Sequence, residues 1–357
     1  MLPSLASFSS RLIDWQKRHG RHDLPWQQTR DAYRIWLSEI MLQQTQVSAA
    51  IPYFERFLAR FPDLASLAAA PQESVLESWA GLGYYARARN LHHCARQIMN
   101  EHHGRFPERA ETLATLAGIG RSTAAAIAVF STGERAAILD GNVKRVLCRH
   151  AGVEGFPGTS AVEKRLWLLA ESRLPESDIE AYTQGLMDLG ATLCTRQQPR
   201  CGECPVAADC VARSTGKQAE LPSPKPRTAP LPERSASFLL LHDGNAILLQ
   251  RRPPSGIWGG LLVPPEGQPE EILSQLGLAG HLCRTLPPLM HTFTHFRLRM
   301  EAHVCMLTAR PSTLHDPSWH WLPLKAAESA ALPTPVRKLI AALKPEPEFR
   351  LVATAPG

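Results

Sequence analysis

Four cysteines lie close together in the second half of the chain, and they constrain the fold more than any other feature. They are separated by six, two and five residues: Cys194, Cys201, Cys204 and Cys210. In disulfide frameworks the cysteines are spread along a small secreted chain. In zinc sites they usually form two tight pairs that lie far apart in the sequence. Here only the middle two cysteines form a tight pair. Four thiolates are also the ligand set of a [4Fe–4S] cluster. The spacing therefore favours an iron–sulfur loop, with a zinc site or a segment without metal as the alternatives.

The length and the charge of the chain limit its class. A chain of 357 residues is long enough for two domains. The N-terminus has no basic segment before a long apolar core, and no apolar run reaches the roughly 18–20 residues that span a bilayer. We therefore expect a cytoplasmic protein with reduced thiols and no membrane contact, associated with the nucleoid if it is bacterial. The net charge of +6 and the pI of about 9.0 are compatible with a polyanionic partner.

Amphipathic helices are expected throughout residues 1–215. Apolar residues recur there at helical spacing, in segments separated by glycine and proline. These segments are 33–46, 49–60, 72–79, 86–100, 124–131 and 143–150. The pattern predicts an α-helical first domain.

The composition changes after residue 215. Five prolines between 221 and 232 predict a stiff, extended linker at 216–234. Two apolar segments then flank Asp243-Gly244-Asn245, which is a hairpin signal. Apolar and polar residues alternate over 296–306, as in a half-buried strand, and a helix is expected at 335–343. Residues 235–357 are therefore expected to form a smaller α+β domain.

Two glycines, Gly118 and Gly120, separate an amphipathic helix from a helix of small residues. They allow a tight turn and a close approach of the backbone to a partner. The following helix then presents free N–H groups that can bind a phosphate. This pattern is typical of a helix–hairpin–helix that grips the DNA backbone without reading sequence. The alternative is a simple turn between two helices.

Two carboxylates are candidates for acid and base chemistry. Glu39 lies on an otherwise apolar helix face, where burial raises a carboxyl pKa and keeps the group protonated as a general acid. Asp140 follows an apolar run and precedes a helix. The simpler interpretations are a buried ion pair for Glu39 and a helix N-cap for Asp140. Together the two provide the acid and the carboxylate that cleavage of a glycosidic bond requires.

A polar run follows Glu39 on the chain, at the end of the same expected helix. It consists of Gln43, Gln44, Thr45 and Gln46. Amide side chains at such a position can fill a gap in a base stack or hydrogen-bond to base edges. This run is therefore a candidate for contact with nucleic acid.

Five parts of the sequence together resemble a known family. They are 36–46, 81–90, 118–123, 139–146 and the four cysteines. The chain resembles the adenine DNA glycosylases of the MutY type, within the helix–hairpin–helix base-excision superfamily, over nearly its whole length. The resemblance implies a helical glycosylase domain with a [4Fe–4S] cluster loop and a Nudix-like second domain. It also implies removal of adenine mispaired with 8-oxoguanine or guanine in double-stranded DNA, after the adenine has been flipped out of the duplex.

The resemblance also assigns roles to individual residues. Glu39 is expected to protonate adenine N7, Asp140 to stabilise the oxocarbenium-like sugar, and Asn142 to support this centre. Gln44 and Tyr84 are expected to enter the base stack. The other expected DNA contacts are Gln43, Thr45, Arg87, Arg89, Gly118, Gly120 and Ser122. The cluster ligands are Cys194, Cys201, Cys204 and Cys210.

Ser122 separates this chain from the strand-cleaving relatives. Endonuclease III-like members of the superfamily carry a lysine at this position, which forms a Schiff base with the sugar. A hydroxyl group cannot form that imine. We therefore expect a monofunctional glycosylase with little or no lyase activity.

The second domain resembles the Nudix-fold domain of the same family, which senses 8-oxoguanine. The family's Phe-Ser-His loop corresponds to Phe293, Thr294 and His295, with a threonine in place of the serine. The acidic motif of Nudix hydrolases is incomplete at Glu270 and Glu271, so hydrolysis of nucleoside diphosphates is not expected. The alternative interpretation of the histidines is that they lie on strand faces, which we prefer for His303.

Three other functions remain open from the sequence. They are a bifunctional glycosylase/lyase acting on oxidised pyrimidines, a DNA-binding module with a structural metal, and a nucleotide hydrolase. Ser122 argues against the first, Glu39 against the second and the incomplete acidic motif against the third. We expect the protein to act as a monomer.

Overall fold

The structure is a computed structural model that describes residues 7–226, 230–278, 280–307 and 316–343, without the side chains of 280–283. The chain divides into two compact units, Met1–Ala70 with Ala86–Thr228, and Pro71–Tyr85 with Ala229–Gly357. The boundary between Thr228 and Ala229 falls inside the linker expected at 216–234. The membership of Pro71–Tyr85 in the second unit was not expected, because this segment has the same helical pattern as its neighbours. Each unit is described separately.

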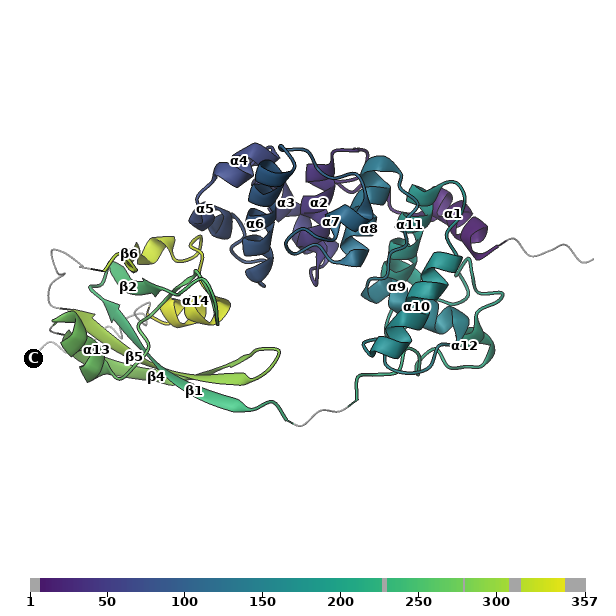
Figure 1. The fold of residues 1–357 in the computed structure, drawn as a ribbon. Helices are drawn as coiled ribbons and strands as arrows, with labels where there is room; N and C mark the ends of the chain where they lie inside the picture. The colour runs from purple at the N-terminus through teal and green to yellow at the C-terminus, as the bar shows by residue number, and fades with distance from the viewer. Residues whose placement is uncertain (1–6, 227–229, 279, 308–315, 344–357) are drawn as a thin grey trace, which may run out of the picture. The chain divides into compact units, whose positions relative to one another are not determined.

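The first unit is helical, as expected (Figure 1). Its helices are α1 (Phe8–His19), α2 (Ala32–Leu42), α3 (Val47–Arg60), α4 (Leu64–Ala69), α6 (Ala86–Glu101), α7 (Ala110–Leu113), α8 (Arg121–Thr132), α9 (Gly141–Ala151), α10 (Ser160–Ser172), α11 (Ile179–Asp188) and α12 (Val211–Ser214). A π-helix, η1 (Leu189–Leu193), directly continues α11. The α-helical fold class predicted for this part of the chain is confirmed.

Side chains cap several of these helices and so fix where they begin. The Asp31 side chain accepts from the Tyr33 backbone N–H at α2, and Asp63 forms a capping box with Ser66 at α4. Asp140 caps α9. Such caps satisfy backbone N–H groups that have no partner within the helix, each worth about 1 kcal/mol.

The helix expected at 33–46 ends earlier than the periodicity suggested. Helix α2 ends at Leu42, and Gln44 takes a positive φ of 58° between α2 and α3. The polar run therefore forms a turn and not a helix end. A left-handed residue other than glycine is uncommon and often marks a constrained functional position.

A hydrophobic core joins the first helix of the unit to its later helices. Leu12 of α1, Val143 and Leu147 of α9, Leu166 of α10 and Leu186 of α11 belong to one buried cluster. The cluster fixes α9, which carries Asp140 at its start, against α11 and α1. The position of that carboxylate is thus set by packing that involves residues far apart in the sequence.

The second unit contains a mixed β-sheet (Figure 1). Its elements are α5 (Gln72–Ser78), β1 (Glu233–His242), β2 (Ala246–Arg251), β3 (Leu262–Val263), α13 (Pro269–Leu276), β4 (Gly280–Thr292), β5 (Arg297–Leu307), β6 (Trp319–Pro323), the 3-10 turn η2 (Leu324–Ala326) and α14 (Thr334–Ala341). The strand order is β3-β2-β1-β5-β4, with β6 paired to β2. Strands β1 and β5 are parallel, and the other pairs are antiparallel.

Helices pack against both faces of this sheet. Phe238, Met300 and Val304 lie in a core with Val336 and Leu339 of α14, whereas Leu239 and Cys305 pack with Ile272 of α13. The expected α+β class, the hairpin between β1 and β2, and the strand at 296–306 are confirmed.

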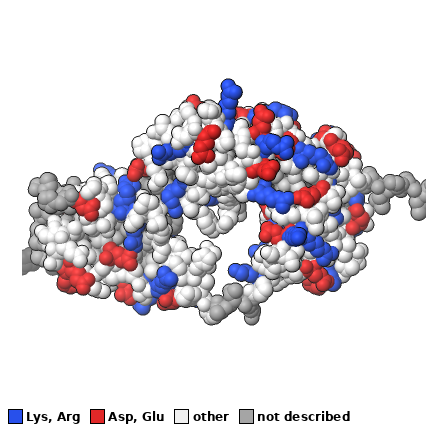
Figure 2. All heavy atoms as spheres, in the orientation of Figure 1, with Lys and Arg blue, Asp and Glu red and all other residues white. Residues whose placement is uncertain are grey.

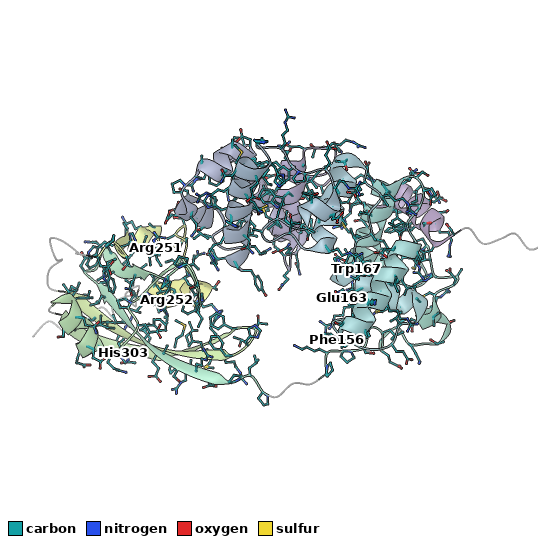
Figure 3. The ribbon with its side chains drawn as sticks, viewed as in Figure 1. Phe156, Glu163, Trp167, Arg251, Arg252 and His303 are labelled. Carbon is teal, nitrogen blue, oxygen red and sulfur yellow. The ribbon has the colours of Figure 1, made fainter. Side chains whose placement is uncertain are left out.

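The alternation expected for β5 breaks at its end. Cys305 is buried under α13, and Met306 is 46% exposed. His303 lies on the strand, where its Nδ1 is 3.1 Å from the Thr285 hydroxyl (Figure 3). This contact agrees with the interpretation of His303 as a strand-face residue.

Charged side chains of both signs are interspersed over the helical elements on the face shown in Figure 2. Several form ion pairs, among them Arg30–Glu180 at 2.6 Å and Lys144–Glu163 at 2.6 Å. The positive net charge is thus partly paired locally. Among the described residues, every helix is too short or too polar to cross a membrane.

Candidate functional site

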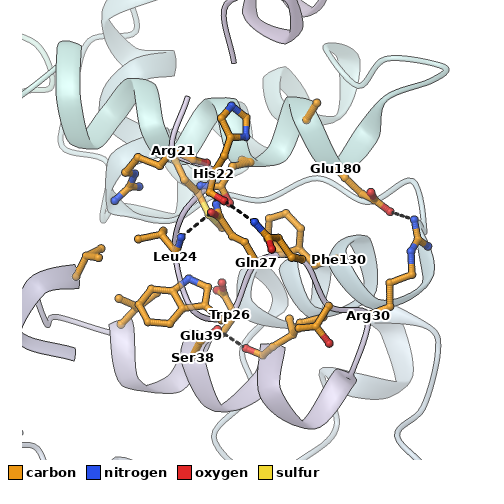
Figure 4. Close-up of a pocket in the computed structure, with 18 of the residues that line it drawn as sticks. Arg21, His22, Leu24, Trp26, Gln27, Arg30, Ser38, Glu39, Phe130 and Glu180 are labelled. Carbon is orange, nitrogen blue, oxygen red and sulfur yellow. Dashed lines mark hydrogen bonds and ion pairs between the residues drawn. The ribbon is translucent and has the colours of Figure 1, made fainter. Parts of the chain in front are cut away.

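A cavity of about 630 Å³ opens into the first unit beside Glu39 (Figure 4). Its walls come from the loop between α1 and α2, from α2 itself and from α11. The lining residues are Gln16, Arg21, His22, Leu24, Trp26, Gln27, Gln28, Thr29, Arg30, Ile35, Ser38, Glu39, Leu42, Val47, Phe130, Glu180, Ala181, Gln184 and Met187. Ligand sites are commonly concave, with aromatic walls and a few convergent polar groups, and this cavity has that composition.

Glu39 is placed on α2 so that its carboxyl lines this cavity. Burial and, to a lesser extent, the neighbouring Asp140 carboxylate raise the pKa of Glu39 to about 8. Among the described residues, no basic side chain forms an ion pair with it. A carboxyl in this setting is protonated at neutral pH, which is the state a general acid needs.

Asp140 begins α9 and is held by the start of that helix. Its Oδ1 accepts a hydrogen bond of 2.7 Å from the Val143 backbone N–H. Burial raises the pKa of Asp140, while bonds from the backbones of Val143 and Asn142 and the charges of Arg145 and Lys144 act in the opposite direction. The N-cap interpretation and the catalytic interpretation are therefore compatible, because the cap fixes the carboxylate in place.

Asn142 lies in the first turn of α9 and faces the π-helix. Its Oδ1 accepts from Arg145 Nη2 at 2.9 Å, and the same Nη2 donates to the Gly190 carbonyl at 2.7 Å. A Cβ at Gly190 would lie 2.6 Å from the Asn142 Cβ, so only glycine fits there. Arg145 Nε also donates to the Cys194 carbonyl at 2.8 Å. The segment that carries the cysteines is thus tied directly to the start of α9.

Ser122 has a local structural partner. Its Oγ accepts a 2.9 Å hydrogen bond from the Leu139 backbone N–H, directly before Asp140. The hydroxyl therefore helps to fix the backbone that carries the carboxylate. This contact does not test the expected contact of Ser122 with DNA.

The hairpin before α8 has the features expected for a phosphate site. Gly118 has a φ of 76°, and a Cβ there would lie 2.7 Å from the Asn90 Cβ. Gly120 is the N-cap of α8, and the space where its Cβ would project is open. The N-terminus of α8 is thus uncovered at Gly120. Contact with DNA stays a prediction for both glycines.

Gln44 and Tyr84 are both exposed and both have left-handed backbone conformations. Their φ angles are 58° and 50°, and Tyr84 is 59% exposed. An exposed aromatic side chain at a constrained backbone position, such as that of Tyr84, is suited to contact a binding partner. Insertion of these two side chains into a base stack stays a prediction.

The structure corrects the expectation for Arg87. This residue is 8% exposed. Its Nη1 donates to the carbonyl oxygens of Ile40, Met41 and Gln43 at 3.0, 2.9 and 2.6 Å, and to the Thr45 hydroxyl at 3.2 Å. The guanidinium thus satisfies the carbonyl groups at the end of α2 and shapes the turn at Gln43 and Thr45, so it is not placed as a surface phosphate contact.

Arg89, two residues further on, is only partly buried. Burial lowers the pKa of its guanidinium, which remains a cation in water. Its contact with a DNA phosphate stays a prediction.

The four cysteines meet at one small cavity, which all of them line. Burial and then the charges of Cys194, Cys210 and Cys201 raise the pKa of Cys204 to about 11. Thiolates this close repel one another unless a cationic iron core compensates them. Among the described residues, no three ligands converge on a single metal ion. A four-iron cluster binds one thiolate per iron, so its ligands need not converge, and the four residues fit such a group.

Arg149 supports the cysteine segment from α9. It is 3% exposed. Its guanidinium donates to the carbonyl oxygens of Thr195, Arg196 and Leu221 at 2.6, 2.9 and 2.8 Å, and its Nη1 lies 3.5 Å from the Cys194 sulfur. A buried cation here fixes the loop backbone and also compensates negative charge on the thiolates.

In the second unit, Phe293, Thr294 and His295 form the turn between β4 and β5. Thr292 pairs with Arg297, and the Phe293 N–H donates to the Phe296 carbonyl at 2.9 Å. Phe293 stacks on Phe296 with ring centroids 4.6 Å apart, whereas Thr294 and His295 are exposed. The turn thus presents a hydroxyl and an imidazole, and its contact with a lesion stays a prediction.

Sequence reasoning missed most of the cavity wall. The loop between α1 and α2 contributes Arg21 and Trp26, and α11 contributes Gln184, with the buried Asp188 behind them. One signal was available, because Gln184 and Asp188 are polar residues four apart on the same side of helix α11, and Asp188 follows the apolar pair Leu186 and Met187. A side chain of this kind on a buried face needs a partner.

The chain matches three protein-family models. Residues 37–172 match the HhH-GPD superfamily base excision DNA repair proteins, 194–210 the iron–sulfur binding domain of endonuclease III, and 236–342 the NUDIX domain. It is 35% identical to an adenine DNA glycosylase of Buchnera aphidicola subsp. Acyrthosiphon pisum over 338 residues, 93% of this chain and 96% of the relative. It is 33% identical to the human adenine DNA glycosylase, covering 94% of this chain and 73% of the relative.

Two solved structures share the helical fold. A thermostable thymine-DNA glycosylase is 28% identical with a TM-score of 0.54, and the match covers 58% of this chain and 95% of that one. Endonuclease III in a non-covalent DNA complex is 19% identical with a TM-score of 0.50, over 58% and 94% of the two chains. The second likeness concerns the fold alone.

Proposed function

Because the chain belongs to the adenine DNA glycosylase family, we propose that it excises adenine opposite 8-oxoguanine or guanine in double-stranded DNA and leaves the DNA backbone uncut. The protein is a DNA glycosylase of base excision repair that binds a [4Fe–4S] cluster. Beyond this, we propose four points: which mispair is recognised, that the DNA strand is not cut, that the protein acts as a monomer, and which residues carry out the reaction. The observation that carries it is a carboxyl group with a raised pKa, that of Glu39, in a cavity close to a second carboxyl group, that of Asp140, which the start of α9 holds in place.

Glu39 acts as the general acid in this proposal. Adenine is flipped out of the duplex into the cavity, where the protonated carboxyl donates to N7 of the base. Protonation makes adenine a neutral leaving group and so weakens the glycosidic bond. General acid catalysis of this kind contributes on the order of 10²–10⁴-fold to a rate.

Asp140 stabilises the cationic sugar that forms as the bond breaks. The carboxylate is held by the backbone of α9, so little reorganisation is needed when positive charge develops. Asn142, fixed by Arg145, supports this end of the helix. The mechanism requires the two carboxyl groups to have different protonation states and different roles, as in other enzymes that cleave glycosidic bonds.

The DNA contacts are proposed from exposure and backbone geometry. The uncovered N-terminus at Gly120 binds a backbone phosphate, and Gln44 and Tyr84 enter the base stack. In the second unit, Thr294 and His295 contact the 8-oxoguanine opposite the adenine.

The [4Fe–4S] cluster is held by Cys194, Cys201, Cys204 and Cys210. Bound there, it supplies a rigid cross-link of the loop that follows η1. Arg145 and Arg149 of α9 bind the backbone of the same segment.

Ser122 supports the monofunctional assignment. The hydroxyl cannot form an imine with the sugar, and its Oγ is engaged by the Leu139 N–H. After excision, the abasic strand is expected to stay intact until alkali is added. Trapping with borohydride as efficient as that of a true lyase would contradict this part of the proposal.

The deciding experiment is single-turnover release of adenine from a duplex with one adenine opposite 8-oxoguanine. Duplexes with adenine opposite guanine, with thymine glycol and without damage are the comparisons. We expect adenine release from the first two duplexes only, with an alkali-labile strand. Folded, cluster-loaded protein that releases no adenine would overturn the proposal.

A further inference from the structure

The last of the four cysteines follows a residue that is bonded to the first helix of the unit. Asp209 directly precedes Cys210, and its Oδ1 accepts a 2.6 Å hydrogen bond from Arg11 Nη2 of α1. The Nε2 of His150, near the end of α9, lies 3.1 Å from the same oxygen. Arg11 and Asp209 are 198 residues apart in the sequence. One carboxylate oxygen thus joins α1, α9 and the segment that carries the cysteines.

Aromatic packing adds a second contact between α1 and this corner of the unit. The Phe8 ring meets the His150 ring edge-on with centroids 4.7 Å apart, and the Arg173 Cζ lies 4.5 Å from the centroid of the Phe8 ring. Phe8 and His150 are both buried. Phe8 and Arg11 are three residues apart, so they lie on the same side of α1. The start of α1 is therefore packed on the histidine that contacts Asp209.

The residue after Cys210 is also fixed against α9. Val211 begins α12. Gly152, which ends α9 with a φ of 63°, lies so close to it that a Cβ there would be 2.6 Å from the Val211 Cγ1. The Cys210 sulfur itself lies 3.6 Å from the Arg149 carbonyl oxygen. The backbone on both sides of Cys210 is thus attached to the end of α9, and on the side of Asp209 also to α1.

The other three cysteines are held by different contacts. The Cys194 carbonyl accepts from Arg145 Nε of α9 at 2.8 Å. Cys201 and Cys204 belong to one turn, in which the Cys204 N–H donates to the Cys201 carbonyl at 3.5 Å. These contacts come from α9 and from the turn itself. Cys210 is therefore the ligand whose place depends on α1.

The contact between α1 and Asp209 is partly open to water. The side chains of Arg11 and Asp209 are 14% and 45% exposed. Contacts near the surface open locally while the core of a protein stays folded. The Arg11–Asp209 contact can therefore separate without unfolding of the helical unit.

We propose that Arg11 and Asp209 are positioning residues of the cluster site, and that separation of α1 from Asp209 is the local opening through which iron is lost. While the contact is closed, the backbone before Cys210 is fixed and its thiolate stays on the iron. After opening, the Fe–S bond to Cys210 breaks, a donor atom of a chelator takes its place on the iron, and the thiolate takes up a proton from water. The inference concerns how the cluster is retained and does not depend on which base is excised.

The test measures how fast intact, cluster-loaded protein loses its cluster. The protein is mixed with EDTA at neutral pH without oxygen, and the decay of the visible absorbance of the cluster is followed at increasing urea. Local opening exposes little surface, so it hardly depends on urea, whereas global unfolding depends on it steeply. For wild type we expect a loss rate that is nearly constant at low urea and rises only close to the unfolding transition.

Arg11→Met removes the donor and keeps a side chain of similar reach. We expect the loss rate at low urea to rise about fivefold or more. The midpoint of urea unfolding should change little, because an ion pair that is partly exposed adds little to global stability. A residue that only supports the fold would shift the unfolding transition and leave the rate at low urea unchanged.

Asp209→Ala is the second variant, because it removes the other partner of the same contact. It is expected to raise the rate at low urea at least as much. The double variant with Arg11→Met should be no faster than Asp209→Ala alone, because both changes break one contact. Lys17→Met is the matched control, since Lys17 ties the same helix to Asp178 at the start of α11 with a 2.7 Å ion pair. Its loss rate should stay at the wild-type value.

Three results would overturn the inference. The first is a low-urea loss rate for Arg11→Met that equals the rate for Lys17→Met. The second is a wild-type loss rate that follows the urea dependence of global unfolding throughout. The third is a double variant in which the effects of Arg11→Met and Asp209→Ala multiply, because the two residues would then act independently.

Discussion

The cavity beside Glu39 and the segment of the four cysteines each contain an ionisable side chain removed from bulk water, but the two side chains differ in their partners. In the cavity, the Glu39 carboxyl has no ion-pair partner among the described residues, and its pKa is raised to about 8. At the cysteine segment, the Arg149 guanidinium donates to three backbone carbonyl oxygens. The first arrangement keeps a proton available for reaction, whereas the second uses its hydrogen bonds to hold a loop.

Within one helical unit, one side chain is therefore suited to take part in a reaction, and the other is suited to hold the backbone in place. A buried acid without a counter-ion costs stability but gains a proton that can be transferred near neutral pH. A buried cation whose donors all have acceptors is held in one position, and none of its donors is left to contact a substrate. Changes in the first region should therefore alter the cleavage rate more than stability, and changes in the second should do the reverse.

The largest effect on cleavage is expected for Glu39→Gln. The amide has nearly the same size but no acidic proton, so single-turnover adenine release should fall on the order of 10³-fold. Cluster absorbance should stay close to wild type, and so should the thermal unfolding midpoint at pH 5, where Glu39 is protonated in the folded wild type. A variant with a normal rate would show that Glu39 is not the general acid, and it would favour the alternative of a DNA-binding module with a structural metal.

Asp140→Asn should produce the next largest loss. Asparagine is as good an N-cap as aspartate, so α9 should keep its start and its stability. The missing negative charge should slow cleavage by about 10²–10³-fold. The rate is measured in single turnover and the stability by urea unfolding. Equal losses of stability and activity would show that Asp140 acts only as a cap.

The pH dependence of cleavage should follow the raised pKa of Glu39. The acid must be protonated, so the rate should be level below pH about 8 and fall about tenfold per unit above it. Protonation of Asp140 should lower the rate again in acid. A rate that rises steadily through pH 9 would contradict the assignment.

The same shift has a consequence for stability. The folded state holds the Glu39 proton more tightly than the unfolded state, so the contribution of this group to the free energy of unfolding falls as the pH rises from about 4.5 to about 8. Glu39→Gln should therefore be more stable than wild type above pH 8. Urea unfolding of both proteins at pH 5 and pH 8.5 measures the difference.

The smallest effect on cleavage, and the largest on stability, is expected for Arg149→Met. Loss of the donors leaves the buried carbonyl of Leu221 and the partly buried contacts to Thr195 and Arg196 without their partner, which should cost roughly 2–3 kcal/mol. Cluster occupancy should fall with stability. The cleavage rate per cluster-loaded molecule should stay within about threefold of wild type, which is roughly 0.7 kcal/mol.

Arg213→Met is the matched control for Arg149→Met. Arg213 also borders the cluster cavity and donates to a backbone carbonyl, that of Ala207, but it is exposed. Its loss should change stability by less than about 1 kcal/mol. If cluster-loaded Arg149→Met has normal stability but a much lower cleavage rate, the proposed difference between the two regions is wrong.

Local patterns were enough to predict the helical first part, the α+β second part and the cysteine cluster. Helical and strand periodicity depend on neighbours within a few residues, so they are readable without tertiary information. The raised pKa of Glu39 was also foreseen, because its apolar neighbours are on the same helix. The early end of α2 was not, because the cause lies in Arg87, more than forty residues away.

The sequence by itself determined the kinds of elements and the clustering of the thiolates, and it proposed the two carboxylates. Only the tertiary structure decided that Arg87 is buried under α2, that Pro71–Tyr85 belongs to the second unit, and that Arg11 binds Asp209. Each of these depends on a contact between distant segments or on which face of a helix is buried. A buried polar group must find its partner wherever the packed chain provides one, and that partner does not have to be near in sequence.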